Sequence, residues 1–423
     1  MGVLRLLLAI SVFADHSGKS VVLDLLIRDY LSVKLFFIVS GFYMSMVLNE
    51  KYTQNHAYAL FVQNRILRLY PVYLLCLIIK IFISYYAFTL NYASVYISSV
   101  PKLMHNFENF SFLAILYLIL SNIFIVGSNL AEFITVPYVP RFTDVLILAQ
   151  GWSLDVEFLF YLIVPFLARS NLRILFTILF TSQAIYILTN IQFNRPFSPG
   201  HFYNRYCFIS ELWLFILGMI AYRFYGSYRF FCTTKPDCLW IRIYKIIAIG
   251  GIVLFGVFCF KNYLYEGLNY YFLQLRKFYY IDDFIIIGLV TIIVPFLFHV
   301  THQSKLDKQL GDLSYPLYLV HAPILFGLPA VFPFMPQWFV TFHSEISLII
   351  SLCLAVLFAR YLESKIDVYR QLRVKNQSYA ISETNPLLKA ALYLLLVPVL
   401  LIMIIEILVV LPDMQRYINK III

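Results

Sequence analysis

The stretch LSVKLFFIVSGFYMSMVL, residues 31–48, contains a single charged side chain, Lys34. An apolar run of this length, without the alternation of a half-buried strand, predicts a helix that crosses a lipid bilayer, because a hydrocarbon core about 30 Å thick takes about 20 residues. Similar runs recur along the chain. Lipid cannot satisfy unpaired backbone groups, and continuous runs exclude a transmembrane barrel. The sequence therefore predicts an all-α, polytopic transmembrane bundle.

The composition of the 423 residues agrees with a membrane protein: 61% are hydrophobic and 13% are charged. A soluble domain carries about 25% charged residues. The net charge of +10 is scattered among predicted loops rather than gathered in one patch, so it predicts topogenic charge and no nucleic-acid partner. The six cysteines show no metal-ligand or redox spacing. We expect no metal site, and free thiols at Cys232 and Cys238.

Eleven apolar runs are interpreted as spans, ten in a core and one at the C-terminal end. The first run resembles a signal peptide, but Asp15 and His16 stand where a small-residue cleavage site would be, so we expect it to remain as a helix. The runs are 2–16, 31–48, 69–89, 145–168, 173–190, 206–224, 243–260, 281–300, 314–334, 344–362 and 387–411.

A further apolar run, residues 111–127, decides the topology of everything after it. If it does not cross and the N-terminus is cytoplasmic, the inside loops hold more Lys and Arg than the outside loops; if it crosses, the bias reverses. The positive-inside rule therefore favours an interfacial or re-entrant segment. The predicted organisation is a membrane core at 1–362, a basic cytoplasmic linker at 363–386, and an extra span with a short tail at 387–423.

Ionisable groups inside a predicted span are costly and mark candidate functional sites. Arg5 and His16 are eleven residues apart, which is about 20° past three helical turns, so both side chains leave one face about 16 Å apart along the axis. A snorkelling arginine and a helix-capping histidine would give the same pattern.

Two further motifs place polar groups at the ends of predicted spans. Arg65 and Arg68, in RILRLYP, are i and i+3 and point the same way just before the third span. Paired guanidiniums suit phosphate, although simple topogenic anchoring also explains them. In GWSLDVEF, Trp152 and Ser153 cluster with Glu157, a carboxylate that needs a cationic partner such as His or Arg.

The last motif, LSYPLYLVHAP, puts Ser314, Tyr318 and His321 on one helical face, at i, i+4 and i+7. These polar groups support either a substrate site or a structural hydrogen-bond network. Lys34 stands alone near one end of the second span, where we expect its side chain to snorkel towards the membrane surface.

In their order along the chain, the Arg5-x10-His16 pair, LFFIVSGF, RILRLYP, WSLDVEF and LSYPLYLVHAP resemble the acyltransferase-3 family of bacterial membrane acyltransferases, over roughly residues 1–360. The resemblance implies ten core spans with the N-terminus inside. Lys34 departs from the acidic or polar residue that is frequent there, so acceptor chemistry at this position differs. The family's appended hydrolase-like domain has no counterpart after 387–411, which leaves acceptor specificity to the bundle or to a separate extracytoplasmic partner protein.

By resemblance, the activity is O-acylation in a bacterial inner membrane, from cytoplasmic acyl-CoA, usually acetyl-CoA, to a surface glycan such as lipopolysaccharide or a lipid-linked sugar. Arg5, Arg65 and Arg68 would hold the CoA phosphates. His16 would act as general base with Glu157 orienting it, and Ser153 or Ser314 would stabilise the oxyanion. Trp152, Tyr318, His321 and Lys34 would support the substrates.

Sequence leaves other interpretations open. A covalent acyl-histidine at His16 fits the same residues as a general base. A glycan-lipid flippase would use buried charges to line a path, although the internal repeats typical of such transporters are not visible. A non-catalytic membrane subunit of polysaccharide assembly is the third alternative.

Overall fold

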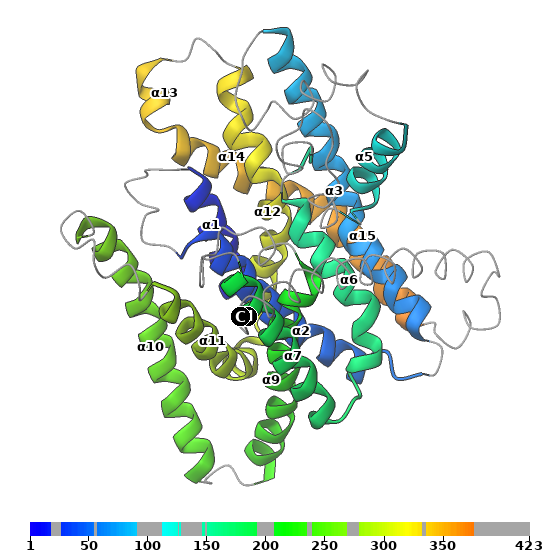
Figure 1. Ribbon diagram of the computed structural model, residues 1–423, viewed down its shortest axis with the longest axis vertical. Coiled ribbons are helices and arrows are strands. Elements are labelled where there is room, and N and C mark those ends of the chain that lie inside the picture. Colours follow the sequence, from blue (N-terminus) through cyan, green and yellow to red (C-terminus); the bar gives the residue numbers. More distant parts are fainter. Residues whose placement is uncertain are drawn as a thin grey trace, which may run out of the picture.

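The computed structural model describes residues 1–17, 27–54, 57–90, 112–125, 127, 146–148, 150–192, 207–234, 239–268, 279–331 and 336–375. Throughout these ranges the regular secondary structure is helical (Figure 1). The helices are α1 (Gly2–Ser17), α2 (Asp29–Glu50), α3 (Ala57–Thr89), α5 (Phe112–Phe124), α6 (Gly151–Leu167), α7 (Leu172–Gln192), α9 (Phe208–Thr234), α10 (Leu239–Leu268), α11 (Tyr279–Thr301), α12 (Lys305–Val331), α13 (Gln337–Thr341), α14 (His343–Leu357), the π-helical η5 (Phe358–Glu363) and α15 (Ser364–Lys375).

Helices α2 and α9 form the centre of one half of the bundle. A Cβ atom at Gly41 of α2 would lie 2.1 Å from the carbonyl oxygen of Phe215, and one at Gly218 of α9 would lie 2.0 Å from that of Ile38. Only glycine lets the two backbones approach this closely, as at other helix crossings in membranes. The glycine of the LFFIVSGF motif therefore has a packing role in this chain.

Helix α12 forms the centre of the other half and packs against α1, α3 and α14. Figure 1 shows α1, in dark blue, beside α12, in yellow. This packing brings the first and last of the polar motifs together, although they are about 300 residues apart in sequence. The helices that position the candidate site are therefore α1, α2, α3, α6 and α12.

Six of the described helices are long and apolar enough to cross a membrane, so the chain is a multi-pass membrane protein. They are Asp29–Glu50, Ala57–Thr89, Phe208–Thr234, Leu239–Val257, Asp283–Thr301 and His343–Lys375. Helices α1 and α6 are shorter, with 16 and 17 residues. Ten core spans and a cytoplasmic N-terminus stay predictions, and the extra span at 387–411 lies outside the described residues.

Helix α5 occupies the part of the 111–127 run that the structure describes. Its 13 residues rise about 20 Å, which is less than the roughly 30 Å of a hydrocarbon core. The helix alone is therefore too short for a span, in line with the interfacial or re-entrant interpretation.

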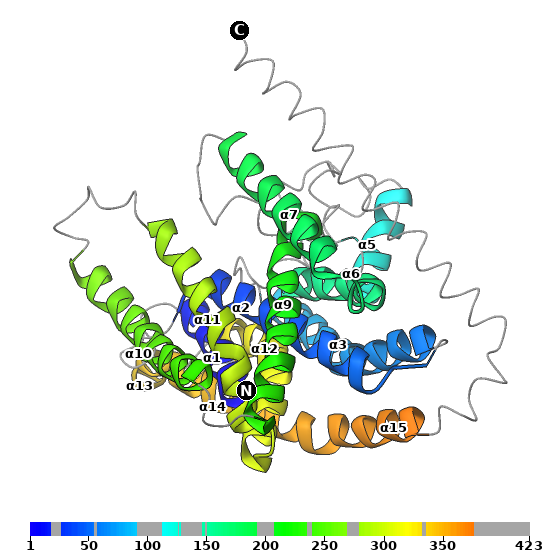
Figure 2. The ribbon, with the colours of Figure 1, turned by 90° about the horizontal axis from the view of Figure 1, so that it is seen from below.

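Several boundaries differ from the sequence prediction: α9 ends at Thr234 rather than at residue 224, and α12 begins at Lys305 rather than at residue 314. Two other differences bear on the charged residues. The third predicted span began at residue 69, but α3 begins at Ala57, so Arg65 and Arg68 lie inside this helix rather than before it. The segment after Glu363, predicted as a loop-like linker, begins as the helix α15, which packs along α3 (Figure 2). Its polar composition resembles a loop, yet Asp367 and Arg370 form an i,i+3 ion pair of 2.6 Å that supports a surface helix.

Candidate active site

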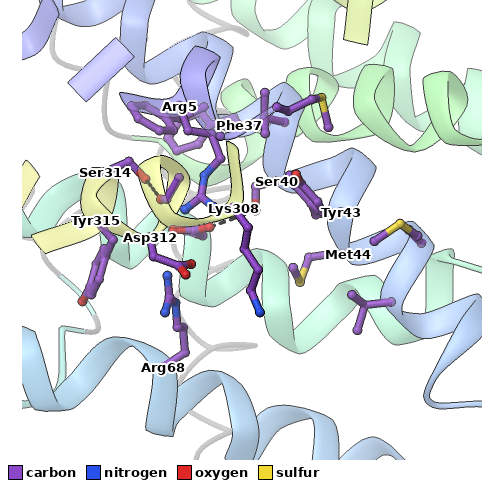
Figure 3. Close-up of a pocket in the computed structure, with 18 of the residues that line it drawn as sticks. Arg5, Phe37, Ser40, Tyr43, Met44, Arg68, Lys308, Asp312, Ser314 and Tyr315 are labelled. Carbon is purple, nitrogen blue, oxygen red and sulfur yellow. Dashed lines mark hydrogen bonds between the residues drawn. The ribbon is translucent and has the colours of Figure 1, made fainter. Parts of the chain in front are cut away.

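A cavity of about 560 Å³ lies between α1, α2, α3, α6, α11 and α12. Residues near the helix ends, such as Lys51, His302 and Lys308, form its mouth, and Ser153, Ser314 and Tyr318 lie among the residues deeper in the bundle. The volume is in the range of small-molecule and cofactor sites. Figure 3 shows Arg5 and Lys308 extending into this space, with Arg68 directed towards Asp312.

Arg5 and Arg65 both line the cavity. Within the described residues, neither guanidinium forms an ion pair with a carboxylate. Arg65 is 8% exposed and lies over two rings, 5.3 Å from the centroid of Phe61 and 5.8 Å from that of Tyr161. Cation–π contacts partly compensate its lost hydration but leave the N–H donors available. Two guanidiniums in one cavity are therefore available for an anion.

Arg68 lines the same cavity but is already paired. Its guanidinium lies 3.2 Å from Glu363 of η5 and 3.9 Å from Asp367 of α15. Arg65 and Arg68, which were predicted to share a face, both line this cavity, but the carboxylates near Arg68 come from a segment about 300 residues away. No pattern in the sequence indicates this ion pair.

Glu157 lies in the wall of the cavity, where it accepts hydrogen bonds from Ser40 (2.8 Å) and Tyr161 (2.5 Å). The hypothesis that Glu157 orients His16 does not match these contacts. His16 touches other residues, at the far end of α1. The cationic partner predicted for Glu157 is replaced by two hydroxyl donors, which satisfy a carboxylate without a formal counter-ion.

A hydrogen bond between hydroxyls joins two motifs at the deep end of the cavity. Ser153 donates to the carbonyl oxygen of Gln150 (3.0 Å), so the 2.7 Å contact between Ser153 and Tyr318 is a bond donated by Tyr318. Ser314 donates to the carbonyl of Gly311 (2.7 Å). Each hydroxyl proton is thus engaged, and an oxyanion role for either serine requires a change of partner. Nearby, the Trp152 indole stands edge-on to the Phe37 ring, with centroids 6.4 Å apart.

His16 lies outside the cavity lining, at the opposite end of α1 from Arg5. Its Nδ1 is 2.9 Å from Nε2 of His321, and the two rings stack with centroids 5.2 Å apart. Its Nε2 is 3.5 Å from a carboxylate oxygen of Asp29, and its side chain is 30% exposed. The structure therefore joins two histidines that were predicted separately. Asp29 was missed, because it precedes the apolar run of α2 and resembles an ordinary helix-start acid.

The prediction that Lys34 snorkels is wrong. Lys34 is 7% exposed, and its ammonium lies 3.1 Å from the hydroxyl of Tyr186 and 3.6 Å from a carboxylate oxygen of Glu211. These partners come from α7 and α9. An ion pair with a hydrogen-bonding neighbour inside the bundle holds the charge in place, so the side chain does not reach for the surface.

Asp307, at the start of α12, fixes the end of α1 that carries Arg5. It accepts hydrogen bonds from the backbone N–H groups of Gly2 (2.7 Å) and Val3 (2.9 Å), as a capping residue supplied by another helix. Burial raises the pKa of the Asp307 carboxyl, but these bonds and the Met1 amine outweigh it and bring the pKa to about 2. A Cβ atom on Gly2 would overlap the Asp307 carbonyl oxygen, so this contact is tight.

Metal ligands do not gather anywhere in the ranges that the structure describes: no group of three His, Cys, Asp or Glu side chains is close enough to hold an ion. Cys232 is a free thiol, as predicted, while Cys238 lies outside the described residues.

Fold and cavity define a multi-pass membrane protein with a pocket between its helices, in which Arg5 and Arg65 form no ion pair with a carboxylate of the described residues. When the sequence is compared with family models, the acyltransferase domain model Acyl_transf_3 matches residues 1–361. The chain therefore belongs to the acyltransferase-3 family and is a membrane acyltransferase. Comparison with curated proteins and with solved structures found no match.

Proposed function

We propose that the protein is an O-acyltransferase of a bacterial cytoplasmic membrane, which moves an acyl group, in the simplest case acetyl, from cytoplasmic acyl-CoA to a sugar hydroxyl of a surface glycan or its lipid-linked precursor. The single observation that carries the donor assignment is the cavity with Arg5 and Arg65, two guanidiniums that face one space without a carboxylate partner in the described residues. Guanidiniums bind phosphate oxygens in pairs of parallel hydrogen bonds, and CoA carries several phosphates.

The donor would lie with its phosphates among Arg5, Arg65 and Lys308 and with its acyl arm directed into the bundle. Deep in the cavity, the arm meets the hydrogen bond between Ser153 and Tyr318. The Tyr318 ring lies 6.0 Å from that of His321, which stacks on His16. The thioester would therefore have to displace this contact to approach His16, which frees the Tyr318 hydroxyl to donate to the carbonyl oxygen, whereas Ser153 would also have to leave the Gln150 carbonyl before it could donate.

Transfer then balances as a simple acyl exchange. The sugar oxygen forms a bond to the thioester carbon, and His16 accepts the hydroxyl proton. Collapse of the tetrahedral intermediate breaks the C–S bond, and the CoA thiolate takes the proton from His16. Glu157 keeps Ser40 and Tyr161 in place beside Arg65, which makes it part of the donor cavity in this proposal.

Binding of CoA to the purified protein tests the donor site. We expect Arg5→Ala to weaken CoA binding by roughly 10–100-fold, the equivalent of one lost charge-assisted interaction. Arg173→Ala is the matched control, because Arg173 is exposed at the start of α7 and does not line the cavity. Equal affinities for wild type and Arg5→Ala would remove the donor site from this cavity.

A further inference from the structure

The hydrogen bond between His16 and His321 has a defined donor and a defined acceptor, which follow from the contacts of the buried ring. His321 is fully buried, and its Nδ1 lies 2.7 Å from the carbonyl oxygen of Tyr318. A carbonyl oxygen only accepts hydrogen bonds, so the proton of a neutral His321 sits on Nδ1. Its Nε2 therefore carries a lone pair.

That lone pair assigns the tautomer of the neighbouring ring. His321 Nε2 lies 2.9 Å from His16 Nδ1, and one of the two nitrogens must carry the hydrogen. With the His321 lone pair in this position, His16 Nδ1 is the donor. The reverse assignment requires a doubly protonated His321 at zero exposure, stacked on another imidazole. A buried cation without a contacting carboxylate is costly, so this arrangement is disfavoured.

A neutral His16 that donates from Nδ1 has its lone pair on Nε2. This atom faces Asp29 Oδ2 at 3.5 Å, at the partly exposed end of the ring. The Asp29 carboxylate also meets the Asp15 carboxyl and the backbone N–H of Tyr30, but each carboxylate oxygen accepts more than one hydrogen bond. The lone pair of His16 Nε2 and an oxygen of Asp29 therefore match a ligand with two donors. Neighbouring hydroxyls of a sugar supply such a pair, one for each acceptor.

We propose that His321 is a positioning residue that holds His16 as its Nδ1–H tautomer, and that the acceptor sugar docks at the other edge, with one hydroxyl on His16 Nε2 and a second on Asp29. This assignment rests on the proposed acyl transfer and adds an acceptor site to it. The reacting hydroxyl loses its proton to Nε2, and Asp29 stabilises the imidazolium that forms. Donor and acceptor thus approach from opposite ends of α1.

Substitution at His321 tests the positioning role. The side-chain carbonyl of Gln in His321→Gln can accept from His16 Nδ1, whereas His321→Leu offers no acceptor. Loss of the correct tautomer lowers kcat by about 10⁴-fold in another His-dependent acyl transfer. We expect His321→Leu to lower kcat by at least 100-fold with unchanged KM for acyl-CoA. The kcat of His321→Gln should be at least tenfold higher than that of His321→Leu. Equal kcat values for the two variants would overturn the positioning role.

The tautomer itself is measured by nitrogen NMR on ¹⁵N-histidine protein, with His16 assigned by difference from His16→Asn. We expect a protonated Nδ1 and an unprotonated Nε2 on His16 near neutral pH, and loss of this preference in His321→Leu. An Nε2–H tautomer, or a doubly protonated ring, in the wild-type protein would overturn the inference whatever the activities are.

Asp29→Asn tests the acceptor site, with Asp283→Asn as control. Asp283, near the start of α11, lies 3.4 Å from Arg28 and accepts a 2.6 Å hydrogen bond from the Tyr30 hydroxyl. It contacts both neighbours of Asp29 but is not a proposed acceptor ligand, so Asp283→Asn controls for a change in the local packing. We expect Asp29→Asn to raise the KM for the acceptor at least tenfold and to leave CoA affinity unchanged, and Asp283→Asn to change neither. An acceptor KM unchanged in Asp29→Asn would remove Asp29 from the site. If His16→Ala kept full activity, by contrast, the proposed function itself would fail.

Discussion

Arg65 and Arg68 stand three residues apart on one face of α3, yet their replacement by alanine is predicted to have different consequences. Arg68 is paired with Glu363, which is 4% exposed, at 3.2 Å. Arg68→Ala leaves that carboxylate buried without its cation, which costs about 3–5 kcal/mol of stability. Arg65 contacts aromatic rings and no carboxylate in the described residues, so Arg65→Ala forfeits only about 1 kcal/mol.

The effects on donor binding are predicted in the opposite order. Arg65 has free N–H donors in the cavity, so Arg65→Ala should weaken CoA binding by roughly 10–100-fold. For Arg68→Ala, the main result should be a lower unfolding temperature and lower protein yield. A double replacement, Arg68→Leu with Glu363→Leu, removes both charges and should recover most of the lost stability, because an apolar pair of similar size substitutes well for a buried ion pair.

Thermal unfolding in detergent and calorimetric titration with CoA, carried out on the same preparations, separate the two roles. If Arg68→Ala unfolded at the wild-type temperature, or if the Arg68→Leu/Glu363→Leu protein were as unstable as Arg68→Ala, the pair would not be structural. If Arg65→Ala bound CoA with wild-type affinity, Arg65 would not be part of the donor site.

Three further substitutions test other contacts. Asp307→Ala should cost about 1 kcal/mol through loss of the cap on α1. Because the folded pKa of about 2 lies below the usual value of 3.8, the stability difference from wild type should persist above pH 3.8 and vanish as the pH falls through 2, measured by unfolding at several pH values. Gly41→Leu should prevent the protein from folding, since the added side chain would push α2 away from α9 and disrupt their packing. Size-exclusion chromatography measures the folded protein, and a normal profile would contradict the close crossing of the two helices. Lys34→Met should destabilise more than Lys34→Met with Glu211→Met, since only the single change removes the Lys34 ammonium from a buried carboxylate that stays in place, and equal unfolding temperatures would argue against the ion pair.

Much of the fold could be predicted from local patterns. Each predicted apolar run of the core coincides with a described helix, and several, such as those of α1, α2, α7 and α11, match to within a few residues at both ends, because the bilayer fixes both the length and the hydropathy of a span. Helical periodicity also placed Ser314, Tyr318 and His321 on one face, and the structure finds all three buried in α12. These successes share a cause: each depends only on residues close together in sequence.

The parts that failed depend on contacts between distant segments. Nothing near Lys34 in the sequence indicates that Glu211 of α9 neutralises it, so the local pattern predicts snorkelling. The hypothesis that Glu157 orients His16 does not hold for the same reason: Glu157 contacts Ser40 and Tyr161, whereas His16 contacts other residues. The pairing of His16 with His321 and Asp29 arises from the packing of three helices, which one-dimensional spacing does not encode.

The central claim is that His16-dependent acyl transfer from CoA to a sugar hydroxyl takes place in this bundle. In the most direct test, purified protein is incubated with radiolabelled acetyl-CoA and a membrane fraction rich in glycan lipids. Wild type is compared with His16→Ala at matched protein levels and matched CoA affinity. We predict label in the glycan fraction for wild type and at least a 100-fold lower rate for His16→Ala. Transfer by His16→Ala at the wild-type rate, or wild-type protein that leaves the glycan unlabelled, would contradict the account.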